Sequence, residues 1–207
     1  MIPLMLDFSG KKVTIFGGGD VGVRKAGFFC REAEVTVYSR SFSSRLAGMG
    51  VTLVETDLSV KSDNELLQLL TGSDLAVATT PDPVLNNRIG ALCRSQGILF
   101  NNARGEPGDV VIPSVIRGEN FTLSITTAGK SPAISRYLRE HLQSSLPCLE
   151  RMIRLQERLR RFLRQTEPEI MKRREILVSV LNDPDAWEAL REGEDAAWNL
   201  IERKYLA

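Results

Sequence analysis

The sequence predicts an α/β protein whose first half folds as a doubly wound parallel sheet with helices on both faces. Short β-rich apolar runs alternate with helix-length segments through that half, and a glycine-rich turn follows the first run. In residues 149–207, by contrast, the apolar residues recur only at helical spacing. We therefore expect a sheet domain over residues 1–112, a small α/β section over 113–148 and a helical unit over 149–207.

Five apolar runs are expected to form the parallel sheet. Parallel strands buried on both faces are apolar nearly throughout, as Val13-Thr14-Ile15-Phe16 and Leu75-Ala76-Val77-Ala78 are. Helix-length segments separate several of the runs, which is the doubly wound arrangement. The five runs are Lys12–Phe16, Glu34–Tyr38, Val51–Glu55, Asp74–Thr79 and Ile98–Asn101.

The small middle section is predicted to contain a hairpin and a helix. The β-like runs Val110–Ile116 and Phe121–Thr126 are separated by a turn-rich spacer, which favours a hairpin. Ser131 is expected to cap a helix that begins at Pro132, because proline lacks the N–H that a first helical residue leaves unpaired. The strand predicted over residues 110–116 would be exposed in a section this small, so we expect a second chain to cover it.

Composition places the chain among ordinary soluble proteins. Apolar residues make up 43% and charged residues 26%, and the net charge of +1 gives no global field that favours nucleic acid or an anionic membrane. No run approaches the ~20 apolar residues of a membrane-spanning helix. The three cysteines lack metal-binding spacing, so we predict free thiols, no metal site and a cytoplasmic location.

A glycine-rich turn, G-x-G-x-x-G in residues 17–22, directly follows the first predicted strand and opens a predicted helix. Gly17 permits the tight turn, Gly19 lets the backbone approach a pyrophosphate, and Gly22 lets helix and strand pack closely. The helix is expected to run from Val21 to Arg31, and its positive end faces the phosphates. Asp20 and Val21, at this end, are further candidate cofactor-binding residues. The turn therefore predicts a Rossmann-type domain that binds NAD or NADP. A glycine turn without a ligand is the alternative.

Polar residues end three of the predicted strands at the edge where such sheets bind ligands. The second strand ends at Ser39, Arg40 and Ser41, without the acidic residue that binds a ribose 2′-hydroxyl. Arg40 with its two serines can contact a 2′-phosphate, which favours NADP, or it can stack on adenine or face solvent. Thr79-Thr80 and Asn101-Asn102 are expected to face the nicotinamide and the substrate, with turn formation as the competing role.

Four stretches resemble the precorrin-2 dehydrogenase module, which is found alone or as the N-terminal part of siroheme synthase. Residues 17–26 resemble the family's G-G-G-x-V-A-x-R-K stretch, and residues 78–82 with Asn86 and Asn87 resemble its A-A-T-x-D…N-x-x-V region. Ile112-Pro113-Ser114 resembles the strand that follows. Residues 128–133 with Arg136, Leu138 and Arg139 resemble the segment G-G-x-S-P…R-x-x-R. The Arg-Lys helix together with the Gly-x-Ser-Pro loop separates this family from ordinary Rossmann enzymes.

The resemblance implies oxidation of precorrin-2 to sirohydrochlorin by a homodimer whose central section supplies the subunit contact. Some members also insert iron. Because this tetrapyrrole substrate carries eight carboxylates, Arg136, Arg139 and Arg154 become candidate substrate-binding residues, together with Asn102 and Ser131. A solvated helix face is the alternative for the more distal arginines.

One departure from the family affects the predicted acid–base residue. The family has an aspartate in N-V-V-D-x-P, whereas this sequence has Gly105 at that position in residues 102–107. Glu106 and Asp109 follow it, and either carboxylate is a candidate replacement. The alternatives are a bifunctional dehydrogenase and ferrochelatase, a dehydrogenase for another reduced tetrapyrrole, or a non-catalytic homologue that binds tetrapyrrole or dinucleotide.

Overall fold

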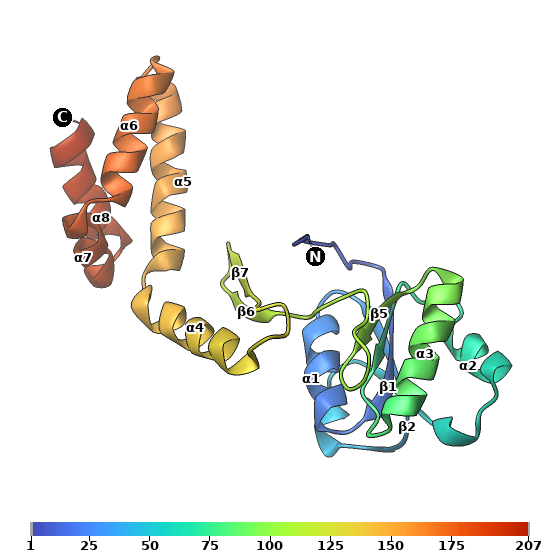
Figure 1. The fold of residues 1–207 in the computed structure, drawn as a ribbon. Helices are drawn as coiled ribbons and strands as arrows, with labels where there is room; N and C mark the ends of the chain where they lie inside the picture. The colour runs from blue at the N-terminus through green and yellow to red at the C-terminus, as the bar shows by residue number, and fades with distance from the viewer. Residues whose placement is uncertain (1, 207) are drawn as a thin grey trace. The chain divides into compact units, whose positions relative to one another are not determined.

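A computed structural model describes residues 2–206 of the chain, which divides into two compact units, residues 1–112 and 113–207 (Figure 1). Each unit has its own apolar core, and each is described by itself. The further division of the second unit into a central and a helical section stays a prediction.

The first unit is built on a five-stranded, all-parallel sheet with the strand order β3-β2-β1-β4-β5. The strands are β1 (Lys12–Gly18), β2 (Glu34–Phe42), β3 (Thr52–Glu55), β4 (Leu75–Ala78) and β5 (Leu99–Asn102). The strand order reverses between β1 and β4, and open α/β sheets bind their ligands beside such a reversal, at the carboxyl ends of the strands. The fold class predicted from the sequence is confirmed.

Helices cover both faces of this sheet, with α1 (Asp20–Phe29) on one side and α2 (Asp63–Leu70) and α3 (Pro83–Gln96) on the other (Figure 1). Alternate residues of the central strand feed the two cores: Val13 and Ile15 pack with α1, whereas Phe16 packs with α2 and α3. Short 3₁₀ turns at Ser44–Leu46 and Leu58–Val60 complete the unit. The buried sheet gives the loops at its carboxyl edge a rigid base.

One predicted strand is wrong at its start. Residues 110–116 were expected to form one run, but the strand begins only at Ser114. Before it, the chain turns back along β5: the Val110 amide donates to the Phe100 carbonyl at 3.0 Å, and Asn101 Nδ2 donates to the Val110 carbonyl at 2.7 Å. Val110 and Ile112 pack against the core under α1, so their apolar character reflects burial on the sheet unit.

The second unit starts with the predicted hairpin and helix. Strands β6 (Ser114–Arg117) and β7 (Thr122–Ile125) pair in antiparallel fashion. Helix α4 (Pro132–Ser145) has Ser131 as its N-cap, whose hydroxyl accepts from the Ile134 amide at 3.4 Å. Both the cap and the proline at the first helical position agree with the sequence prediction.

Four further helices follow: α5 (Leu149–Thr166), α6 (Ile170–Leu181), α7 (Pro184–Glu192) and α8 (Glu194–Ile201), with a final π-helical turn at Glu202–Leu206. Met152, Leu155, Leu159 and Leu163 recur along one face of α5 and form the core with residues of the other helices. Glu150 at the start of α5 accepts from the backbone of Glu119 and Asn120 and so ties the hairpin turn to this helix. Among the described residues, no helix is both long and apolar enough to cross a membrane.

Candidate cofactor and active site

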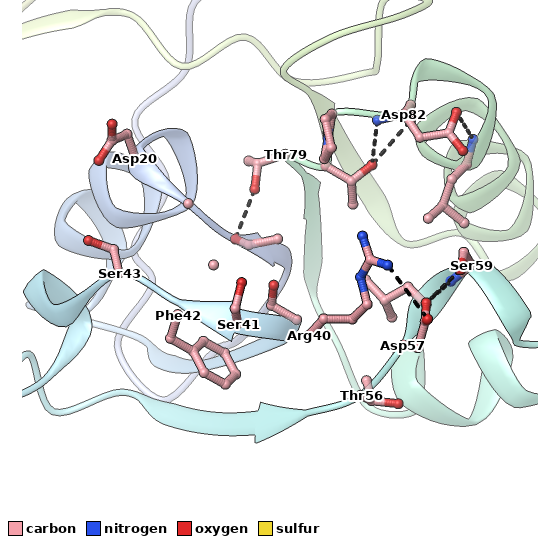
Figure 2. A pocket seen from close by; sticks show the side chains of 18 residues that line it. Asp20, Arg40, Ser41, Phe42, Ser43, Thr56, Asp57, Ser59, Thr79 and Asp82 are labelled. Atoms are coloured by element: carbon pink, nitrogen blue, oxygen red, sulfur yellow. Dashed lines mark hydrogen bonds and ion pairs between the residues drawn. The ribbon is translucent and has the colours of Figure 1, made fainter.

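A cavity of about 600 Å³ opens at the carboxyl edge of the parallel sheet (Figure 2). Segments that end or follow β1, β2, β3 and β4 line it, so the cavity lies where the strand order predicts a ligand. Its volume is in the range of small-molecule sites. The lining residues are Gly17–Asp20, Ser39–Ser43, Thr56–Ser59, Thr79–Asp82 and Leu85.

Residues 17–22, called the glycine turn here, have no room for a side chain at Gly17 or Gly22. Gly17 has a φ of 115°, and a Cβ there would lie 2.7 Å from Thr79 Oγ1. A Cβ on Gly22 would collide with the Gly17 carbonyl. At Gly19 the opposite holds, because no described atom lies within 4 Å of a Cβ position, which leaves space for a ligand against the backbone.

The N-terminus of α1 is free to bind an anion. Its N-cap is Gly19, and no side chain among the described residues caps it. The first N–H groups of the helix therefore keep their hydrogen-bonding capacity, and the helix dipole favours a negative charge there. Together with the open face of Gly19, this arrangement fits the pyrophosphate of a dinucleotide.

Thr79 and Thr80 line the cavity, but their hydroxyls bond within the protein. Thr79 Oγ1 donates toward the carbonyls of Phe16 and Gly17, each at 3.0 Å, and so holds the glycine turn against β4 (Figure 2). Thr80 Oγ1 lies 2.7 Å from Asn86 Oδ1. Turn formation is thus what their hydrogen bonds show, and direct contact with a cofactor stays a prediction.

An acidic residue that the sequence analysis missed lies beside the end of β2. Ser39, Arg40 and Ser41 line the cavity as predicted, and Arg40 Nη1 lies 3.8 Å from Asp57 Oδ2 (Figure 2). Hydrogen bonds from the hydroxyl and amide of Ser59 hold the pKa of Asp57 below its ordinary value, and Arg40 adds to this. Asp57 follows the third strand, so its position at the shared carboxyl edge was the available signal.

Side-chain amides hold the turn after β5, residues 103–107, which we call the rim turn. Asn102 Nδ2 donates to the Glu106 carbonyl at 2.8 Å, and the Glu106 amide donates to Asn87 Oδ1 at 2.9 Å. Asn102 Oδ1 accepts from the Arg104 amide at 3.1 Å. Asn102 therefore has the turn-forming role that was its alternative, and substrate binding by it stays a prediction.

The two candidate carboxylates are placed differently. Glu106 belongs to the rim turn and is exposed. Asp109 lies in the segment that returns along β5, next to the residue that bonds to Phe100. Its charge reaches Cys93 in the last part of α3: burial, with Asp109 as a further cause, raises the pKa of this thiol to about 12.

The predicted substrate residues of the second unit are already engaged. Arg136 Nε and Arg139 Nη2 lie 2.8 and 3.2 Å from the same oxygen of Glu140. Arg154 pairs with Glu194 at 2.7 Å, Glu119 at 3.4 Å and Glu150 at 3.9 Å. Ser131 is the α4 cap. Binding of substrate by these residues stays a prediction.

Comparison with known proteins agrees with this geometry. Residues 4–114 match a family described as "Putative NAD(P)-binding", which confirms the predicted class of cofactor. Precorrin-2 dehydrogenase of Methanosarcina barkeri is 42% identical over 99% of this chain and 92% of its own length. Siroheme synthase of Methylococcus capsulatus is 30% identical over 97% of this chain, which spans 43% of that protein.

A solved structure titled "SirC, precorrin-2 dehydrogenase" has the same fold, with a TM-score of 0.73, 21% identity and coverage of 98% of this chain and 100% of its own. The glycine turn and the strand order indicate a dinucleotide-binding fold, and the 42% identity to the M. barkeri enzyme extends over nearly the full length of both chains. The chain belongs to the precorrin-2 dehydrogenase family.

Proposed function

We propose that this protein oxidises precorrin-2 to sirohydrochlorin with NAD or NADP. The observation that carries the proposal is the 42% identity to the M. barkeri precorrin-2 dehydrogenase over nearly the whole of both chains. The glycine turn adds a physical reason, because its open backbone at Gly19 and the uncapped end of α1 suit a dinucleotide.

The reaction removes one hydride and one proton from the substrate. The bound dinucleotide supplies the two-electron oxidant by accepting the hydride. The protein has to orient the two molecules and to accept the proton at a side chain near the reacting carbon. The glycine turn supports the first task, and a carboxylate in or after the rim turn is expected to perform the second.

We assign the proton acceptor to Glu106 rather than to Asp109. Glu106 follows β5 at its carboxyl end, which is the edge where the cavity opens. Asp109 has left this edge, since the next residue pairs with Phe100 inside the strand and its charge reaches Cys93. The Glu106 carboxylate also has no hydrogen bond or ion pair to any residue in the range 2–206, so it is available to a substrate.

Arg136 and Arg139 are the residues that we expect to bind carboxylates of the substrate. Arg136 and Arg139 share the single carboxylate of Glu140, which leaves one positive charge uncompensated in that group. An anionic substrate can therefore bind there without removing a full ion pair. Arg154, with three acidic neighbours, has less unpaired charge to offer.

A second copy of the chain is the expected partner in solution. Ile134, Tyr137 and Leu138 on α4 are 49%, 61% and 37% exposed, which is unusual for neighbouring apolar side chains on one helix. The β6–β7 hairpin forms only a two-stranded sheet, and such sheets need further packing for stability. A homodimer that covers α4 and the hairpin meets both needs. The three free thiols fit the reducing cytoplasm.

An anaerobic assay that follows nicotinamide absorbance with precorrin-2 as substrate tests the function. The wild-type protein is expected to reduce the nicotinamide and form sirohydrochlorin. Glu106→Gln removes the proton acceptor and should lower kcat by about 10²–10⁴-fold. Glu157→Gln changes an exposed residue on α5 and is the matched control. The kcat of Asp109→Asn should fall far less than that of Glu106→Gln.

Two outcomes would overturn parts of this proposal. If cofactor and tetrapyrrole bind tightly but no nicotinamide is reduced, the protein is a non-catalytic homologue. If Asp109→Asn loses activity and Glu106→Gln keeps it, the dehydrogenase stands and the assignment of the proton acceptor is wrong.

A further inference from the structure

The backbone of Glu106 is held on both sides, while its carboxylate is left free. Its amide donates to Asn87 Oδ1 at 2.9 Å, and its carbonyl accepts from Asn102 Nδ2 at 2.8 Å. Pro107 follows, and a residue before proline is restricted to extended conformations. The Cα–Cβ direction of Glu106 is therefore fixed by contacts that do not use its side chain.

Asn87 is the centre of this arrangement. Its Oδ1 accepts from the Glu106 amide and also from Asn102 Nδ2, at 3.0 Å. Asn102 in turn donates to the Glu106 carbonyl, so the three residues form a closed ring of hydrogen bonds. Asn87 lies on α3 and Asn102 on β5, so the ring joins the rim turn to two rigid elements.

Gly105 makes this ring possible. It has a φ of 130°, and a Cβ there would meet Asn87 Oδ1 and lie 2.9 Å from Asn102 Nδ2. Both atoms belong to the ring, so a side chain at 105 and the ring exclude each other. The glycine at this position is thus a requirement of the way in which the turn is held.

We propose that Asn87 is a positioning residue that, with Asn102 and Gly105, fixes the Glu106 carboxylate at the rim of the active site. The inference rests on the proposed function, in which Glu106 accepts the substrate's proton. It adds that amides on α3 and β5, together with the missing side chain at Gly105, set where this carboxylate lies. If the backbone of Glu106 can move, its carboxylate stays ionisable, but it should accept the substrate's proton more slowly.

The test compares Asn87→Ala with Asn64→Ala, which removes an exposed amide from α2. Asn87→Ala should lower kcat by roughly 10- to 100-fold, because small misplacements of a reacting group cost that much. The cofactor Kd, measured by nicotinamide fluorescence, should match that of the control. Asn87→Asp keeps an acceptor for both donors and should restore most of the lost kcat.

Gly105→Asp approaches the same ring from the other side and returns the residue type that the family has there. The ring predicts a loss of kcat similar to that of Asn87→Ala, because the new side chain displaces Asn87 and Asn102. Gly27→Ala on α1 is the matched glycine control, since a Cβ there has space. This pair keeps the test decisive if Asn87→Ala fails to fold.

The outcomes separate this inference from the proposed function. If Glu106→Gln loses activity while Asn87→Ala and Gly105→Asp both match their controls, the positioning role is wrong and the function stands. If Gly105→Asp raises kcat, the position acts as a vacant catalytic site and the inference is overturned. If Glu106→Gln keeps full activity, the assigned proton acceptor is wrong, and no effect at Asn87 can be ascribed to it.

Discussion

The glycine turn after β1 and the rim turn after β5 lie at the same edge of the sheet but are held in different ways. Missing side chains shape the glycine turn: at Gly17 and Gly22 a Cβ would clash with backbone or with Thr79. Added side chains shape the rim turn, since amides from Asn86, Asn87 and Asn102 bind its backbone. The glycine turn thus depends mainly on side chains that its own residues lack, and the rim turn depends mainly on amides that α3 and β5 supply.

The largest effect is expected on cofactor affinity when a side chain is added to the glycine turn. Gly17→Val places a branched side chain at a φ of 115°, against the backbone and hydroxyl of Thr79. The free protein can relieve the backbone strain by moving the turn, and binding then has to restore it at a cost of about 1–3 kcal/mol, so cofactor affinity should fall by up to roughly 100-fold. Titration of nicotinamide fluorescence measures this, with Gly27→Ala as the control. A Kd close to that of wild type would show that the turn tolerates side chains.

A smaller effect on stability is expected at the amide that supports the rim turn. Asn86 is fully buried, and its Nδ2 donates to the carbonyls of Thr80 and Arg104 at 3.1 and 3.0 Å. Asn86→Ala leaves these carbonyls without that partner and should lower the free energy of unfolding by about 1–3 kcal/mol. Urea unfolding measures the change against Asn64→Ala. Equal stability of the two variants would contradict the role given to the amide.

The choice between NAD and NADP should respond more weakly to substitution, because the Arg40 side chain is exposed and that of Asp57 is only partly buried. Arg40→Ala should weaken NADP binding by up to about fivefold with little change for NAD. Asp57→Ala should weaken NAD binding by a similar factor, since the carboxylate can accept from a ribose hydroxyl. The ratio of the two Kd values for each variant is the measurement. Equal losses for both cofactors in Arg40→Ala would remove the phosphate argument.

Cys93 is expected to be modified more slowly than Cys30. Its reactivity reports on the segment after the rim turn, because Asp109 of that segment is one cause of its raised pKa. A pKa of about 12, raised by burial and by Asp109, keeps this thiol protonated at neutral pH. Its contribution to stability is complete below its ordinary value of 9.0 and is lost as the pH rises toward 12. Iodoacetamide at pH 8 should therefore label Cys30, which is partly exposed, before Cys93. Equal labelling rates in the native protein would show that the segment opens.

Local patterns were sufficient to predict most of the fold. The alternation of apolar runs and helical segments predicted all five parallel strands, and Ser131 with Pro132 marked the start of α4 correctly. The run 110–116 was wrong because apolar residues that pack on a sheet edge and those within a strand look the same in sequence. The structure separates the two cases, because Val110 and Ile112 pack on the core of the first unit and the strand begins only at Ser114.

The same distinction between local patterns and distant contacts separates the parts of the site that were predicted from those that were missed. The place of the glycine turn between β1 and α1 was predicted correctly, because the glycine spacing and the strand and helix around it are local features of the sequence. Its contacts with a cofactor stay a prediction. Asp57 was missed because it reaches Arg40 from a neighbouring strand, and strand order is not visible in the sequence. The role of Asn87 was also beyond reach, since its partners lie 15 and 19 residues away along the chain.

The collision between a side chain at 105 and Asn87 has an evolutionary consequence. Gly105 and Asn87 cannot change independently, because an aspartate can occupy position 105 only after the amide at 87 has moved or been replaced. The two positions are epistatic, and each makes reversal of the other unfavourable. Residues 87 and 105 should therefore covary among relatives of this chain.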